Sequence, residues 1–251
     1  MIVPKEAAEQ GPAAVARLNE ILKTLNLQNP NPKGIFSKAC TIENLIQKAG
    51  NADESLELLG KRILLLLECR PVYGDEQFES CIQAVFHHYS TLLENEPTKE
   101  FVYLLNDLIR YFRSICVNYQ SNFLRESDKW AIRNVKLRHS RLIMYGGLLL
   151  LLGEVSRQPA ENKLEWLLSH LPLTPLDRMA CVYRESGDQN FFRVAGFYNV
   201  FHAKLSDKNI RAGLNLDYKE RYENPTFSEL KANSDGLIAE LMRFVFSQRG
   251  T

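Results

Sequence analysis

The stretch 101–120 carries polar residues whose types and spacing suit phosphate binding. Asn106, Arg110 and Arg113 are spaced i, i+4 and i+7, so they share one face of a helix. Asp107 lies three residues before Arg110, within reach of an ion pair on the same helix. Guanidinium groups match phosphate oxygens through paired hydrogen bonds. The pattern therefore predicts either a polar face for a phosphate-bearing ligand or an ion-pair network that fixes helix packing.

The stretch 129–154 is locally basic. From 129 to 141 it contains five basic residues and no acid: Lys129, Arg133, Lys136, Arg138 and Arg141. On a helix, one ridge is formed by Lys129, Arg133 and Lys136. The adjacent ridge is formed by Asn134, Arg138 and Arg141. Two basic ridges suit a run of phosphate groups. The alternative is a basic helix face that is simply solvated.

Arg133 and His139 suggest a different chemistry, the cleavage of RNA. An arginine followed a few residues later by a histidine resembles the motif of HEPN-type ribonucleases, in which these residues act at a dimer cleft of small helical bundles. Six residues advance a straight helix by about 600°, which leaves His139 roughly 120° away from Arg133. This alternative therefore requires a distorted helix. Otherwise His139 is a buried, hydrogen-bonded residue.

Several common catalytic motifs are missing from the sequence. There is no GxxxxGK[ST], GxGxxG or HExxH pattern, and no Asp-x-Asp pair of the kind that holds two metal ions. The five cysteines are scattered and form no CxxC pair, which favours free thiols over a disulfide framework or a zinc site. We therefore expect no metal, no cofactor and a noncatalytic protein.

The composition is that of an ordinary globular protein. Of 251 residues, 45% are hydrophobic and 24% are charged, with a net charge of +1 that gives no overall attraction to nucleic acid. The longest apolar runs, 63–67 and 148–152, fall far short of the roughly 20 residues that span a bilayer. The first residues lack the features of a signal peptide. The sequence predicts a soluble, cytoplasmic protein with no membrane contact.

Helical periodicity dominates the chain, and the predicted fold class is all-α. We expect a compact multi-helix bundle with a central antiparallel pair, about 99–119 and 129–153, because the connector between them is short. Gly146-Gly147 predicts a kink in the second helix. One domain is expected over 1–251, with a soft boundary near 155–163.

Local signals also predict where individual helices begin. Thr174, followed by a proline and then an acid, has the pattern of an N-terminal cap. Thr226 and Glu229 have the spacing of a capping box. Asp53 precedes an apolar helical run and is expected to cap it.

Four segments in order resemble the helical region of bacterial nucleotidyltransferase-domain proteins. They are KGIFSK (33–38), RILLLLECRPVYGDEQF (62–78), FVYLLNDLIRYFRSICVNYQ (101–120) and KWAIRNVKLRHSRLIMYGGLL (129–149). In that family, a DNA-polymerase-β-like catalytic domain is followed by a helical bundle with similar Asn-Asp-x-x-Arg-Tyr-x-Arg and Arg-Asn-x-Lys-Leu-Arg helices. The resemblance covers about 33–150.

The resemblance does not carry nucleotidyl transfer to this chain. The family's catalytic half, with its Gly-Ser loop and aspartate pair, would precede residue 33, where only 32 residues stand. The chain is then either a standalone helical relative or a shortened form of a longer enzyme. What the resemblance implies is the helical fold and a shared polar surface of Asn106, Asp107, Arg110, Arg113, Arg133, Asn134 and Lys136.

The predicted function is that of a noncatalytic helical module. Its polar surface is expected to bind a phosphate-bearing ligand, such as a nucleotide or RNA phosphate, or a partner protein, such as a separately encoded nucleotidyltransferase. The alternative is a HEPN-type ribonuclease using Arg133 and His139. The sequence leaves the oligomeric state open.

Overall fold

The predicted all-α fold class is confirmed. A computed structural model describes residues 1–32, 34–51, 53–91, 101–123 and 127–248. Over these ranges the chain is predominantly helical, and its β-structure is limited to one isolated bridge between Ile2 and Cys40. The chain divides into two compact units, Met1–Tyr111 and Phe112–Thr251. The division falls within a helix, whereas the predicted soft boundary near 155–163 lies inside the second unit, where α7 ends and α8 begins.

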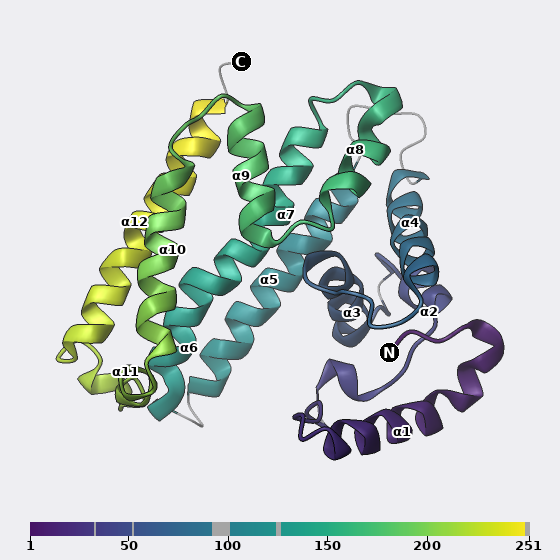
Figure 1. The fold of residues 1–251 in the computed structure, drawn as a ribbon, viewed down its shortest axis with the longest axis horizontal. Helices are drawn as coiled ribbons and strands as arrows, with labels where there is room; N and C mark the ends of the chain where they lie inside the picture. The colour runs from purple at the N-terminus through teal and green to yellow at the C-terminus, as the bar shows by residue number, and fades with distance from the viewer. Residues whose placement is uncertain (33, 52, 92–100, 124–126, 249–251) are drawn as a thin grey trace. The chain divides into compact units, whose positions relative to one another are not determined.

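The first unit is built around one deeply buried helix (Figure 1). Its helices are α1 (Gly11–Thr24), α2 (Ile42–Gln47), α3 (Leu56–Leu67), α4 (Asp75–Thr91) and the first half of α5 (Val102–Phe123). Every residue of α3 from Leu59 to Leu67 is buried. The short helix α2 packs against both α3 and α4. The apolar run 63–67, which is far too short to span a bilayer, therefore belongs to the core of this unit.

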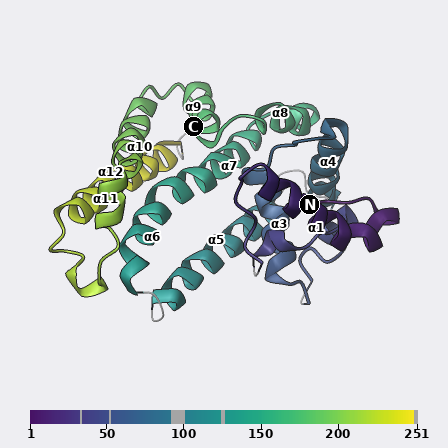
Figure 2. The same cartoon turned by 60° about the horizontal axis from the view of Figure 1, so that its bottom comes forward.

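The second unit is a bundle of longer helices. Its elements after α5 are α6 (Trp130–Lys136), a π-helical segment (Leu137–Arg141), α7 (Leu142–Val155), α8 (Lys163–His170), α9 (Pro175–Glu185), α10 (Phe191–Ser206), α11 (Lys208–Gly213) and α12 (Pro225–Ser247). Helices α10 and α12 lie side by side in both views (Figures 1 and 2). One apolar cluster joins α6 to them: Ala131, Val135, Phe201, Leu214, Phe227 and Leu230.

Of the two helices predicted as a central pair, the second half of the first one lies beside the second one within the second unit. The second half of α5 runs beside the continuous helical stretch 130–155 in both views, and Phe112 contacts Tyr145 edge-to-face with ring centroids 4.5 Å apart. The principal partner of α7, however, is α9 rather than α5. Residues 99 and 100 of the predicted first helix lie outside the described ranges.

Gly146 and Gly147 serve close packing and do not break the helix. Helix α7 runs through both of them without interruption. A Cβ atom at Gly147 would lie 2.7 Å from the carbonyl oxygen of Pro175 at the start of α9. The close approach of the two helix backbones is at Gly147, and the change from α-helical to π-helical structure occurs earlier, at Leu137–Arg141.

The helix caps are partly as predicted. The Thr174 hydroxyl accepts a hydrogen bond from the Asp177 amide at 3.2 Å. The other two predicted caps are wrong, since Asn224 caps α12 in place of Thr226 and Ser55 caps α3 in place of Asp53. In both cases a residue with an equally suitable side chain stands two positions away and takes the cap. None of the helices in the described ranges is both long and apolar enough to cross a membrane.

Candidate functional site

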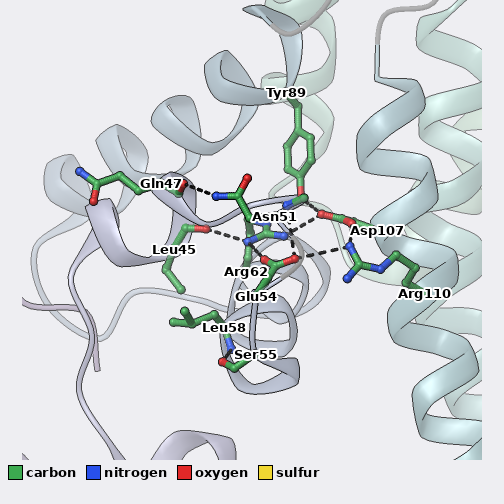
Figure 3. Close-up of polar contacts among 11 residues, drawn as sticks. Leu45, Gln47, Asn51, Glu54, Ser55, Leu58, Arg62, Tyr89, Asp107 and Arg110 are labelled. Carbon is green, nitrogen blue, oxygen red and sulfur yellow. Dashed lines mark hydrogen bonds and ion pairs between the residues drawn. The ribbon is translucent and has the colours of Figure 1, made fainter.

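A buried arginine organises the polar interior of the first unit (Figure 3). Arg62 on α3 has no exposed surface. Its guanidinium forms ion pairs of 2.6 Å with Glu54 and with Asp107. It also donates hydrogen bonds to the Tyr89 hydroxyl at 2.6 Å and to the Leu45 carbonyl at 2.7 Å. An arginine is tolerated in an apolar core only with such a set of partners.

The Asp107 carboxylate accepts hydrogen bonds from three side chains. One carboxylate oxygen accepts hydrogen bonds from Arg62 and from the Tyr89 hydroxyl, each at 2.6 Å. The other oxygen accepts from Arg110 at 2.7 Å, and Arg110 also lies 3.4 Å from Glu54. Two acids thus face two arginines, so the formal charges of the cluster balance. We call these five residues, Glu54, Arg62, Tyr89, Asp107 and Arg110, the arginine cluster.

The pKa directions in the arginine cluster fit a structural role. Burial raises the pKa of Tyr89, and the neighbouring Asp107 charge raises it further, so the phenol stays protonated and donates. Burial alone would lower the pKa of Arg62, but the hydrogen bonds with Glu54 and Asp107 raise it above its usual value. Arg62 therefore remains charged, and both Arg62 and Tyr89 keep the protons that they donate to their partners.

Three of the predicted site residues belong to the first unit, and the structure places them differently. Asp107 is buried, Arg110 is about half exposed, and Asn106 is exposed on α5. Asp107 and Arg110 are brought together, but as an ion pair within the network around Arg62, in which Asp107 is also bound to Arg62. Glu54 and Arg62 were missed, although a basic residue inside the apolar run of α3 signalled that it needed a buried partner.

The remaining predicted site residues belong to the second unit. Arg113 is exposed on α5 and Lys136 is exposed on α6. Arg133 and Asn134 are partly buried on α6. The buried side of α6 is formed by residues such as Ala131 and Val135 in the apolar cluster, which leaves the basic positions on its other sides.

Arg138, in the π-helical segment that follows α6, is bound to other residues of the bundle. Its Nε donates to the Ser234 hydroxyl at 2.7 Å, and it forms an ion pair with Asp235. Both partners belong to α12. Arg138 therefore links the π-helical segment to α12, and its guanidinium group is used for this contact.

His139 is the most constrained polar residue of the second unit. It has no exposed surface and stacks on Phe201 with ring centroids 4.5 Å apart. Its Nδ1 lies 2.8 Å from the Val135 carbonyl, and its Nε2 lies 3.0 Å from the Asn233 amide nitrogen. The side-chain nitrogen of Asn233, Nδ2, also donates a hydrogen bond to the Phe197 carbonyl. The consistent arrangement is a neutral imidazole that donates from Nδ1 and accepts at Nε2.

This geometry argues against the ribonuclease alternative. The helix is distorted, as that alternative required, because residues Leu137–Arg141 form a π-helical segment. Yet His139 is enclosed, and both of its ring nitrogens are occupied by protein groups. A general base must reach the proton that it abstracts. His139 instead occupies the position of a core residue that links α6, α10 and α12.

Other candidate features of the described ranges carry less chemistry. All five cysteines are free, and no group of histidine, cysteine and acidic residues is arranged to hold a metal ion. A cavity of about 390 Å³ in the first unit lies between the first residues of the chain and the segment 37–44. Two of its polar residues, Thr41 and Asn44, already bond to each other in the cap of α2.

Comparison of the chain with protein-family models, with curated proteins and with solved structures found no match.

Because His139 is buried, we expect the free energy of unfolding to depend on pH. Burial lowers its pKa, and the nearby Arg138 charge lowers it further. The unfolded chain therefore binds more protons than the folded chain below about pH 6.5, so stability falls as the pH drops through this value. We expect a slope of up to about 1.4 kcal/mol per pH unit from this group. Urea unfolding of the wild type and of His139→Gln, from about pH 5 to 7, measures the difference.

The matched control is His202→Gln, because His202 is exposed on α10. This variant should keep the wild-type pH dependence. Equal pH slopes in the wild type and His139→Gln would contradict the assignment.

Proposed function

We propose that this protein is a noncatalytic helical module that binds a phosphate-bearing ligand. The binding surface is the basic ridge of α6, defined as Lys129, Arg133 and Lys136, together with Asn134 and with Arg113 on α5. The observation that carries the proposal is the acid-free run 129–141, in which the apolar side of α6 is used for the core. The resemblance to helical regions of nucleotidyltransferase-domain proteins supports the same surface.

A phosphate-bearing ligand is favoured over a partner protein by the composition of the ridge. None of the large apolar side chains of the segment 127–141 is exposed. The cores of protein interfaces are typically rich in aromatic residues and poor in lysine. A ridge of lysine and arginine without exposed apolar side chains instead suits phosphate oxygens, which are bound mainly through charge.

The absence of catalysis is part of the proposal. The acids of the arginine cluster are already paired with arginines. His139, the residue best suited to general acid–base chemistry, is enclosed. The five free cysteines support a reducing compartment such as the cytoplasm.

The test is salt-dependent binding of inorganic polyphosphate, which offers phosphate groups without bases. Lys136→Gln removes one exposed positive charge, so we expect weaker binding and a salt dependence reduced by roughly one phosphate contact. The melting temperature should stay nearly unchanged, because exposed charges contribute little to stability. Fluorescence anisotropy at several salt concentrations provides the measurement.

Lys23→Gln, which removes the same charge from an exposed position on α1, serves as the control for net charge. Arg113→Gln extends the test to α5. If Lys136→Gln and Lys23→Gln bind polyphosphate equally well, the basic ridge is not the binding surface.

A further inference from the structure

An aromatic cluster lies at the start of α6, next to the basic ridge. The ring of Trp130 meets Tyr218 edge-to-face, with centroids 4.9 Å apart. Trp130 also lies 5.9 Å from Phe227, at the start of α12. Since Trp130 directly follows Lys129, the segment between α11 and α12 brings its aromatic side chains to the first residue of the ridge.

Arg221 holds this aromatic cluster together. Its guanidinium carbon lies 3.4 Å from the ring centroid of Tyr218 and 4.4 Å from that of Tyr222. It lies 5.5 Å from the centroid of Trp130, and it donates a hydrogen bond to the Tyr218 carbonyl. Cation–π contacts with three rings fix the positions of these side chains.

Tyr222 is the exposed member of the aromatic cluster. Its exposed fraction is 57%, although Arg221 backs its ring. A large aromatic side chain that is both exposed and held in place offers a ready surface for stacking, because little conformational freedom is lost when a planar group binds. Nucleobases stack on such side chains in proteins that bind single strands.

The charges around Tyr222 indicate where the phosphates of such a ligand would go. The segment 219–223 contains Lys219 and Arg221 but also Glu220 and Glu223, so its formal charges cancel. It offers a base-stacking surface without attraction for a polyanion. The attraction comes from the neighbouring basic ridge of α6, which begins at Lys129.

We propose that the phosphate-bearing ligand is a single-stranded nucleic acid, whose backbone lies on the basic ridge while an unpaired base stacks on Tyr222. This inference rests on the proposed function, which it deepens by naming the ligand class. A free phosphate compound would make no use of Tyr222. A duplex would present its bases already paired and stacked.

The experiment compares two labelled oligomers of about a dozen residues: a single-stranded oligoadenylate and an abasic chain with the same sugar–phosphate backbone. Tyr222→Ala should weaken oligoadenylate binding about 5- to 140-fold, from a stacking energy of roughly 1–3 kcal/mol per base converted at 1.4 kcal/mol per tenfold. Binding of the abasic chain should not change. Tyr222→Phe, which keeps the ring, should bind oligoadenylate like the wild type.

Each result separates this inference from the proposed function. If Tyr222→Ala binds oligoadenylate as tightly as the wild type, or if the wild type binds both oligomers equally, the stacking role is overturned and ridge binding stands. If the wild type binds neither oligomer nor polyphosphate, both proposals fail. Unchanged circular dichroism and melting temperature of Tyr222→Ala exclude misfolding as the cause of a loss.

Discussion

Arg62→Met is expected to destabilise the first unit by roughly 3–5 kcal/mol. The substitution keeps an apolar side chain of similar length in the core but leaves Glu54 and Asp107 without the charge that pairs with them. An uncompensated buried charge is far more costly than the loss of the pair's own attraction. Urea unfolding followed by circular dichroism, with hydrogen exchange of α3 amides to localise the effect, provides the measurement.

The matched control removes the other arginine of the arginine cluster. Arg110 contacts the same two acids, but its side chain is 47% exposed. Arg110→Ala should therefore cost no more than about 1 kcal/mol, because Arg62 still pairs with both acids and a half-exposed ion pair contributes little. If Arg62→Met and Arg110→Ala lower the free energy of unfolding equally, burial of the arginine does not determine the cost of breaking these ion pairs. The triple variant Glu54→Gln, Arg62→Met and Asp107→Asn should recover much of the loss, since the one charge that it leaves without its partners, Arg110, is half exposed to water.

Gly147→Ala is expected to destabilise the second unit by about 1–3 kcal/mol, the usual cost of overpacking. The added methyl group would meet the backbone of Pro175, with its oxygen at 2.7 Å and its Cα at 3.1 Å. Because backbone atoms cannot move aside as a flexible side chain can, α9 must shift away from α7. The free energy of unfolding in urea provides the measurement.

Gly153→Ala makes the same substitution in the same helix and should have the opposite sign. No atom lies within 4 Å of a Cβ built at Gly153. Alanine there should stabilise the protein by up to about 1 kcal/mol through its higher helix propensity. A loss of stability in both variants would mean that helix α7 tolerates no side chain at these positions for reasons other than its contact with α9.

The helical class could be predicted because it depends on local patterns. Apolar spacing and cap residues such as Thr174 act within one or two turns, and the sequence displays them directly. Cap predictions failed at Thr226 and Asp53 because a competing residue stood nearby. Local signals fix the existence of a helix better than its first residue.

The candidate site was harder to predict because its pairings are tertiary. Asp107 stood out as an acid in an apolar helix, but its main partner Arg62 is 45 residues away along the chain. Spacing alone suggested Arg110, which is the more exposed partner. The division of the chain inside α5 could not be predicted from the sequence, because a continuous helix has no linker-like composition at the point where one unit ends and the next begins.

The π-helical segment also explains a spacing that a straight α-helix would not support. Ala131, Val135, His139 and Ile143 are all buried, although they follow one another every four residues. At about 100° per residue, twelve residues would leave the last of them roughly 120° out of phase with the first. A π-turn absorbs one additional residue, so the phase error falls to about 20°. The segment thus acts as a one-residue phase correction that keeps a single line of side chains in the core along two helices.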